Sequence, residues 1–299
     1  MKHGFYFRML KTFAAIFVAV FLLAGCGSSS DVQYYVALGD SLSVGYQPDA
    51  SGVNHVTDQG YPDQIYAALL ATHPNLQLVK LGCPGETIVS MANGGICPYD
   101  AGSQIKQAVE FLLDHQDQVI LVTIDIGVND LLSSGCIQGT TIDQACIQKA
   151  LQELGPNLSF ILSKLFGSVD RDTPVIGMNY YNTFLAAFLA GRPDIAQASD
   201  QLAKAFNQQV LAPVYQIFSF PVADVAGKFQ ISDFTPVASA PLPSPPFPPQ
   251  VPNNLKNLCL LTYMCVPPPQ GPNIHANPNG YGVIAKAFLD VIGTLTLKP

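Results

Sequence analysis

The sequence predicts an α/β fold in which a parallel β-sheet lies between two layers of helices. Short apolar runs rich in β-branched residues alternate along the chain with longer stretches of helical periodicity, and such alternation is typical of βαβ units. The chain has 299 residues, of which 48% are hydrophobic and only 12% are charged, so it can bury a sizeable core. A disordered chain is therefore excluded.

Five apolar runs are expected to be buried parallel strands. Their hydrophobicity is continuous rather than alternating, as a strand covered on both faces requires. They span residues 35–38, 76–81, 119–126, 175–178 and 222–225.

Stretches with helical spacing follow the first four strands, and another one ends the chain. They span residues 62–72, 103–115, 147–166, 195–218 and 281–292. In a sheet of this kind, ligands bind where the strands end, at their carboxyl edge. Functional residues are therefore expected directly after the strands.

One segment, residues 236–252, contains eight prolines in seventeen residues and no charge. Proline lacks the backbone N–H group, so this segment can be neither a helix nor a central strand. Its apolar composition argues against a solvated linker, and we expect an extended loop on the domain surface. Two roles stay open for it, a mere spacer or a cover over an apolar substrate cleft.

The first 25 residues have the features of a secretory signal. They contain three basic residues, no acidic residue and an apolar run over 12–23 that is too short to span a membrane. The run ends in Leu-Ala-Gly-Cys, which resembles the lipobox of bacterial lipoproteins. Residues 26–33 would then be a lipidated Cys26 and a flexible tether, with the folded domain over 34–299. Simple cleavage that leaves a free Cys26 is the alternative. We expect an exported protein, anchored by lipid to the bacterial cell envelope.

Six further cysteines indicate disulfides, because their number is even and the chain is expected to be exported. Fifteen pairings are possible. The cysteines form three couples with separations of 14, 10 and 6 residues, which favours pairing between neighbours. A zinc site is disfavoured because the chain has no C-x-x-C motif. The expected pairs are Cys83 with Cys97, Cys136 with Cys146, and Cys259 with Cys265.

Four loops contain the residues that could carry chemistry. Ser41 follows the first strand, where a nucleophile is expected, although a turn with a helix cap is the alternative. Gly85 and Asn129 follow the next two strands and offer uncharged N–H donors to a developing oxyanion, unless they are a turn glycine and a helix cap. His275 precedes the last helix and would be the base. A doubly wound sheet brings all four loops to one edge.

These four blocks, GDSLS, GCPGET, GVND and IHANPNGY, resemble those of SGNH hydrolases, the GDSL esterase and lipase family. The resemblance covers residues 34–295 and implies a flavodoxin-like α/β/α sandwich around a five-stranded parallel sheet. It further implies ester hydrolysis without a cofactor or metal. Ser41 would be the nucleophile and His275 its base. The N–H groups of Ser41 and Gly85, together with the Asn129 side chain, would form the oxyanion hole.

The last block departs from the family pattern. The family usually has an acid three residues before the histidine, but this position is Pro272, and no Asp or Glu occurs from 234 to 289. We expect the backbone carbonyl of Pro272 to orient His275, since a carbonyl can fix the imidazole tautomer. Asp224 and Asp233 are the alternatives.

Composition also bears on the substrate and partners. A net charge of -7 argues against nucleic acids. The positive mean hydropathy of +0.26 and the absence of Trp favour a lipid or simple ester over a polysaccharide. A glycan deacetylase and a non-catalytic lipid-binding lipoprotein are the alternatives. We expect a monomer.

Overall fold

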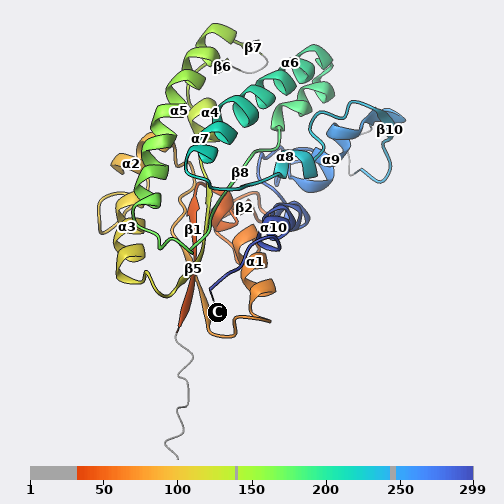
Figure 1. Ribbon diagram of the computed structural model, residues 1–299. Coiled ribbons are helices and arrows are strands. Elements are labelled where there is room, and N and C mark those ends of the chain that lie inside the picture. The colour runs from red at the N-terminus through yellow and green to blue at the C-terminus, as the bar shows by residue number, and fades with distance from the viewer. Residues whose placement is uncertain (1–31, 139–140, 243–246, 299) are drawn as a thin grey trace, which may run out of the picture. The chain divides into compact units, whose positions relative to one another are not determined.

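The computed structural model describes residues 32–138, 141–242 and 247–298. Its centre is a five-stranded sheet in the order β4-β1-β5-β8-β9, in which every neighbouring pair is parallel. The predicted α/β/α fold and all five strands are confirmed (Figure 1). The strands are β1 (Gln33–Gly39), β4 (Leu76–Lys80), β5 (Val119–Asp125), β8 (Val175–Met178) and β9 (Val222–Ala223).

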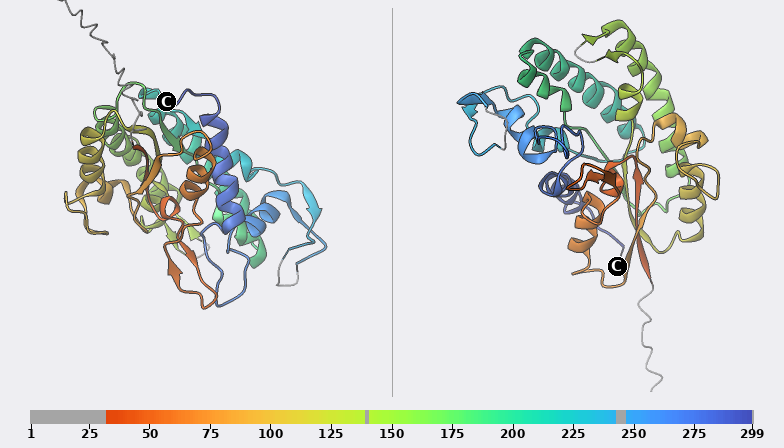
Figure 2. Two further views of the ribbon diagram at one scale, coloured as in Figure 1. Left: turned by 90° about the horizontal axis from the view of Figure 1, so that it is seen from below. Right: turned by 180° about the vertical axis from the view of Figure 1, so that it is seen from behind.

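Helices cover both faces of this sheet (Figures 1 and 2). On one face α3 (Gln104–Asp114) packs against α5 (Gln144–Phe166), and on the other α1 (Tyr61–Leu69) packs against α10 (Pro278–Ile292). In this second layer, the rings of Tyr61 and Phe288 stack with their centroids 4.8 Å apart. Strand β5 is buried at every residue, so the core lies on both sides of the central strands.

The helix predicted over 195–218 is divided into three segments. They are α6 (Pro193–Lys204), the π-helical η3 (Ala205–Leu211) and α7 (Ala212–Ile217). Pro213 has no N–H group to donate to the preceding turn, which explains why the regular α-helical bonding pattern does not continue through this region.

Several short elements were not predicted, because a few residues carry too little periodicity to be recognised. The helical ones are η1 (Leu42–Val44), α2 (Ile88–Asn93), α4 (Val128–Leu132), η2 (Thr183–Ala190), α8 (Val225–Lys228) and α9 (Asn253–Leu261). The strands form three hairpins: β2 (Gln47–Pro48) with β3 (Asn54–His55), β6 (Ile137–Gln138) with β7 (Thr141–Ile142), and β10 (Pro236–Ala238) with β11 (Gln250–Pro252).

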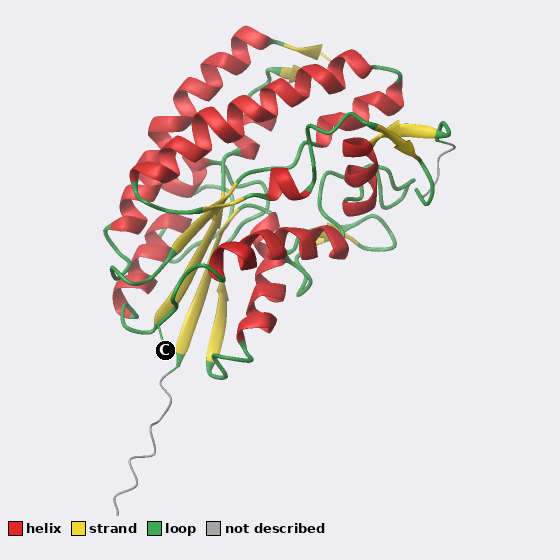
Figure 3. Cartoon of the chain, turned by 45° about the vertical axis from the view of Figure 1, so that its right-hand side comes forward, coloured by secondary structure: helices red, strands yellow, loops and turns green. Residues whose placement is uncertain are grey.

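The described parts of the proline-rich segment, 236–242 and 247–252, are neither helical nor part of the central sheet, as predicted. Its two ends form the β10–β11 hairpin, which lies apart from the central sheet (Figure 3). Val251 of this hairpin is buried in a small second core together with Leu255 and Leu258 of α9. The hairpin is thus packed onto the domain rather than free in solvent.

The cysteines pair with their neighbours, as the spacing predicted. The three disulfides join Cys83 to Cys97, Cys136 to Cys146, and Cys259 to Cys265. Within the described ranges, no group of three or more Cys, His, Asp or Glu side chains could hold a metal ion. No helix in these same ranges has the length and hydropathy needed to cross a membrane. The expected signal and Cys26 lie outside the described residues.

Candidate active site

The structure brings Ser41 and His275 together at the carboxyl edge of the sheet. Ser41 lies between β1 and η1, and His275 lies just before α10. The Ser41 Oγ and His275 Nε2 atoms are 3.0 Å apart and hydrogen bonded, although 234 residues separate them along the chain. The Ser41 side chain makes no capping bond to η1, so its hydroxyl is not a helix cap.

The other ring nitrogen of His275 is held by an amide side chain. Asn273 Oδ1 lies 2.7 Å from His275 Nδ1 and also accepts the backbone N–H of His275 at 3.0 Å. Because that backbone group can only donate, the atom facing the ring must be the amide oxygen. Nδ1 therefore carries a proton, and Nε2 presents its lone pair to the Ser41 hydroxyl.

The expectation that the Pro272 carbonyl orients the base is wrong, since His275 Nδ1 donates instead to the Asn273 side-chain oxygen. An Asn side chain readily folds back onto the backbone two residues further along, and this Asx-turn geometry places its oxygen beside the ring. Asn273 is itself fixed, since its Nδ2 donates to Asn54 Oδ1 at 2.9 Å and its backbone N–H donates to the Tyr263 carbonyl at 3.1 Å.

The two acidic alternatives are engaged elsewhere. Asp224 accepts from Asn179 Nδ2 at 2.8 Å and caps α8, while Asp233 accepts from Asn253 Nδ2 at 2.8 Å. Among the described residues, no carboxylate hydrogen bonds to His275. The base is thus oriented by a neutral group.

Burial sets the protonation of His275. Loss of solvent around the ring lowers its pKa to about 4, and no nearby carboxylate counteracts this effect. One side of the ring is covered by Tyr46 in an edge-to-face contact with the centroids 5.2 Å apart. The imidazole is therefore neutral at neutral pH and can accept a proton.

Three uncharged donors belong to the segments that follow β1, β4 and β5. The backbone N–H groups of Ser41 and Gly85 donate to no other group in the described part of the chain. Gly85 has φ +84°, and a Cβ there would meet nothing within 4 Å, so it borders open space. Asn129 is in the first turn of α4 rather than at its cap. Its Nδ2 donates to the Glu86 carbonyl at 2.9 Å, which leaves a second amide hydrogen.

Two buried carboxylates beneath Ser41 were missed from the sequence. The backbone N–H of Asp40 donates to Asp125 Oδ2 at 3.3 Å, and Tyr61 donates its hydroxyl to Asp125 Oδ1 at 2.6 Å. Asp40 accepts the Leu42 N–H at 3.0 Å and the Tyr180 hydroxyl at 3.2 Å. Burial raises the pKa of both acids, and the charge of Asp40 raises that of Asp125 further. Asp125 stands in the apolar run of β5, and an acid in such a run was the signal that could have revealed it.

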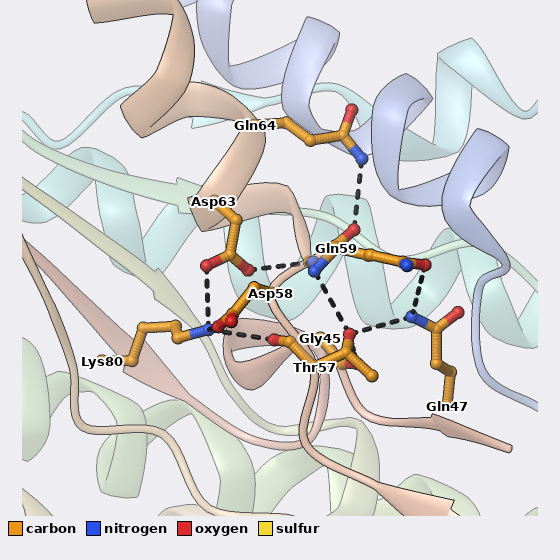
Figure 4. A network of polar contacts seen from close by, with 9 residues as sticks. Gly45, Gln47, Thr57, Asp58, Gln59, Asp63, Gln64 and Lys80 are labelled. Atoms are coloured by element: carbon orange, nitrogen blue, oxygen red, sulfur yellow. Dashed lines mark hydrogen bonds and ion pairs between the residues drawn. The ribbon is translucent and has the colours of Figure 1, made fainter. Parts of the chain in front are cut away.

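The segment that follows Ser41 is braced by a polar network (Figure 4). Thr57 Oγ1 donates to the Gly45 carbonyl at 2.7 Å and accepts from Gln47 Nε2 at 2.9 Å. Lys80 Nζ donates to the Thr57 carbonyl at 3.0 Å and pairs with Asp63 at 2.8 Å. These contacts connect the nucleophile loop to β4 and to the start of α1.

A comparison with protein families finds a match over residues 35–288 to the family described as GDSL-like Lipase/Acylhydrolase. This range contains all four loops. The chain belongs to this family. It is accordingly a carboxylic ester hydrolase.

Solved structures of similar shape include three bacterial enzymes. An extracellular lipase from Streptomyces rimosus is 20% identical with a TM-score of 0.55, over 89% of this chain and 100% of that one. A phospholipase A1 from Streptomyces albidoflavus is 16% identical, with a TM-score of 0.49 over 89% and 100% of the two chains. An acetyl-xylooligosaccharide esterase from Geobacillus is 16% identical, with a TM-score of 0.48 over 89% and 97%. The likeness to the Streptomyces rimosus lipase is one of fold. No curated protein matches the chain.

Proposed function

We propose that this GDSL-family enzyme hydrolyses carboxylic esters through an acyl-enzyme on Ser41. His275 is the general base, and the N–H groups of Ser41 and Gly85 with the Asn129 amide stabilise the oxyanion. The observation that carries this proposal is the 3.0 Å hydrogen bond from Ser41 Oγ to a neutral His275 whose other nitrogen is already held. A nucleophile and a base in this relation are what acyl transfer requires.

The reaction has two halves. In the first, His275 Nε2 takes the Ser41 proton while Oγ attacks the ester carbonyl carbon, and the carbonyl oxygen becomes an oxyanion. The tetrahedral intermediate then collapses, and the alcohol leaves with the proton from His275. In the second half, His275 removes a proton from water, the resulting hydroxide attacks the acyl-enzyme, and Ser41 regains its proton as the carboxylic acid is released.

Asn273 acts on this reaction through His275. It keeps Nδ1 protonated and the ring in place, so that Nε2 faces Ser41 throughout the cycle. A carboxylate in this position would also stabilise the imidazolium by its charge, whereas an amide contributes only its dipole. Orientation is therefore the main contribution of Asn273.

The substrate that we propose is a lipid or simple ester rather than a polysaccharide acetate. The apolar composition and the absence of Trp, a frequent platform for sugar rings, support an acyl-chain substrate. We further propose that the enzyme is exported and is anchored through a lipidated Cys26, with the three disulfides and the lipobox-like sequence as support. All proposed site residues come from one chain, which suits a monomer.

A fluorophosphonate probe tests the proposal, because it reacts only with an activated hydroxyl. It is expected to label Ser41 in the wild-type enzyme and to leave Ser41→Ala unlabelled. Ester turnover by Ser41→Ala should fall by a factor on the order of a million, as for other serine hydrolases that lose their nucleophile. Unchanged turnover in this variant, or a label on another residue, would overturn the assignment.

A further inference from the structure

A pocket opens between α4, the segment after β8, α6 and η3. The space inside the pocket and its open mouth together amounts to about 480 Å³. Its walls are mostly alkyl and aromatic, with Leu131, Leu132, Tyr180, Leu202, Ala203 and Phe206 among the lining side chains.

Three residues of the lining are connected to the proposed catalytic residues. Val128 directly precedes Asn129, the oxyanion donor on α4. Tyr180 donates its hydroxyl to Asp40, the residue before Ser41, at 3.2 Å. Tyr181 donates its hydroxyl to the carbonyl of Ile274, the residue before His275, at 2.8 Å. The pocket lining is therefore connected to the three segments that carry Ser41, Asn129 and His275.

Most polar side chains of the lining are already hydrogen bonded within the protein. Asn182 donates to Ser199 Oγ at 2.9 Å, and Ser199 donates to the Ala196 carbonyl at 2.8 Å. Asn207 accepts the Tyr180 N–H at 3.0 Å and donates to the Tyr180 carbonyl at 2.8 Å. These groups already have partners within the protein, so the wall suits a hydrocarbon chain better than a sugar.

The π-helical segment η3 shapes the inner wall. It presents two consecutive buried residues, Phe206 and Asn207, to the pocket. A Cβ placed on Gly127 would lie 3.4 Å from both Phe206 Cζ and Ile88 Cδ1, so the Phe206 ring lies beside the loop that leads to Asn129. Single turns of π-helix are often found at functional sites, because they redirect side chains locally.

We propose that this pocket binds the acyl chain of the substrate and makes the enzyme selective for medium-length, straight-chain acyl esters over acetyl esters. This inference rests on the proposed function, since it assumes that the ester carbonyl faces Ser41 and Asn129. The acyl group then lies on the α4 side, where the pocket is. The alcohol must leave towards His275 Nε2, which protonates it.

The test is the ratio of kcat/KM for p-nitrophenyl octanoate to kcat/KM for p-nitrophenyl acetate. We expect a ratio of at least about ten in the wild-type enzyme, because even one methylene in an apolar pocket is worth roughly tenfold or more. Ala203→Leu fills the pocket and should lower this ratio about tenfold. The matched control Ala198→Leu lies on the same helix, outside the lining, and should leave the ratio unchanged. A wild-type preference for acetate, or an unchanged ratio in Ala203→Leu, would overturn the pocket assignment.

A binding measurement separates this inference from the proposed chemistry. Calorimetry with sodium octanoate on Ser41→Ala should show binding that the double variant Ser41→Ala/Ala203→Leu weakens about tenfold. Such binding in a protein whose wild type hydrolyses neither ester would support the pocket and contradict the proposed function. Equal binding by the two proteins would contradict the pocket alone.

If Ala203→Leu does not fold, Leu202→Ala serves as a second variant, because it enlarges the same pocket. It should shift the preference from octanoate towards decanoate, whereas an unchanged preference would contradict the assignment.

Discussion

The serine side and the histidine side of the site differ in where their negative charge lies. Next to Ser41, Asp40 and Asp125 are both buried, and the backbone N–H of Asp40 donates to the Asp125 carboxylate. Behind His275, where the family usually has an acid, the neutral side chain of Asn273 contacts the ring. Burial shifts the pKa values on both sides, and on the serine side the charge of Asp40 raises the pKa of Asp125 further.

On the serine side an acidic group holds the backbone, whereas on the histidine side a neutral group holds the base. Asp40 accepts the N–H of Leu42, so its charge holds the turn that carries the nucleophile. His275 receives no such charge, and burial alone keeps its pKa low. The enzyme thus has a base that is neutral over a wide pH range, at the cost of weaker stabilisation of its protonated form.

The largest effect is expected on the serine side. Asn129→Ala should lower kcat roughly a hundred- to a thousandfold, as measured for the loss of one oxyanion donor elsewhere, while KM changes little. Steady-state kinetics with p-nitrophenyl octanoate would measure this. Because Asn129 also donates to the Glu86 carbonyl, the melting temperature serves as the control. If the variant keeps both its fold and its kcat, Asn129 does not belong to the oxyanion hole.

The buried acids should affect stability rather than chemistry. Asp125→Ala leaves the buried Tyr61 hydroxyl without its acceptor, which costs about 1–3 kcal/mol in the free energy of unfolding. Urea denaturation at pH 5 measures this loss. The double variant Asp125→Ala/Tyr61→Phe removes the unpaired hydroxyl and should recover part of it. If the double variant recovers no stability, the lost hydrogen bond is not the cause of the destabilisation.

The single variant Asp125→Ala should also differ from the wild type in how its stability depends on pH. Burial raises the pKa of both acids in the folded state, so the native protein holds a proton that the unfolded chain has already released. Wild-type stability must therefore fall as the pH rises through the folded-state pKa. Asp125→Ala has one carboxylate fewer and should lose less stability than the wild type between pH 5 and pH 8. A steeper loss in Asp125→Ala would contradict the raised pKa of Asp125.

Much of the fold could be predicted from the sequence because its strands are continuous apolar runs, and β8 has the predicted bounds. The division of residues 195–218 into α6, η3 and α7 and the short elements α2 and α4 were not predicted. These features depend on hydrogen bonds and packing between distant segments rather than on local periodicity.

The site could be predicted in part. Ser41 and His275 stand in recognisable blocks after a strand and before a helix, and the structure joins them. Asn273 was missed because nothing in its local sequence distinguishes a side-chain oxygen from the neighbouring carbonyl of Pro272 as the partner of the ring. The contact of Asp40 with Asp125 joins residues 85 positions apart and depends on strand pairing.

The pH profile of kcat/KM, compared between the wild type and Asn273→Asp, tests most directly whether an uncharged group orients His275. A base with a pKa of about 4 should keep the wild-type enzyme active down to that pH, with circular dichroism verifying the fold. A carboxylate at position 273 favours the imidazolium and should move the acidic limb up by about 1–3 pH units. A wild-type limb near pH 6.5, or one that Asn273→Asp leaves in place, would contradict an uncharged orienter behind His275.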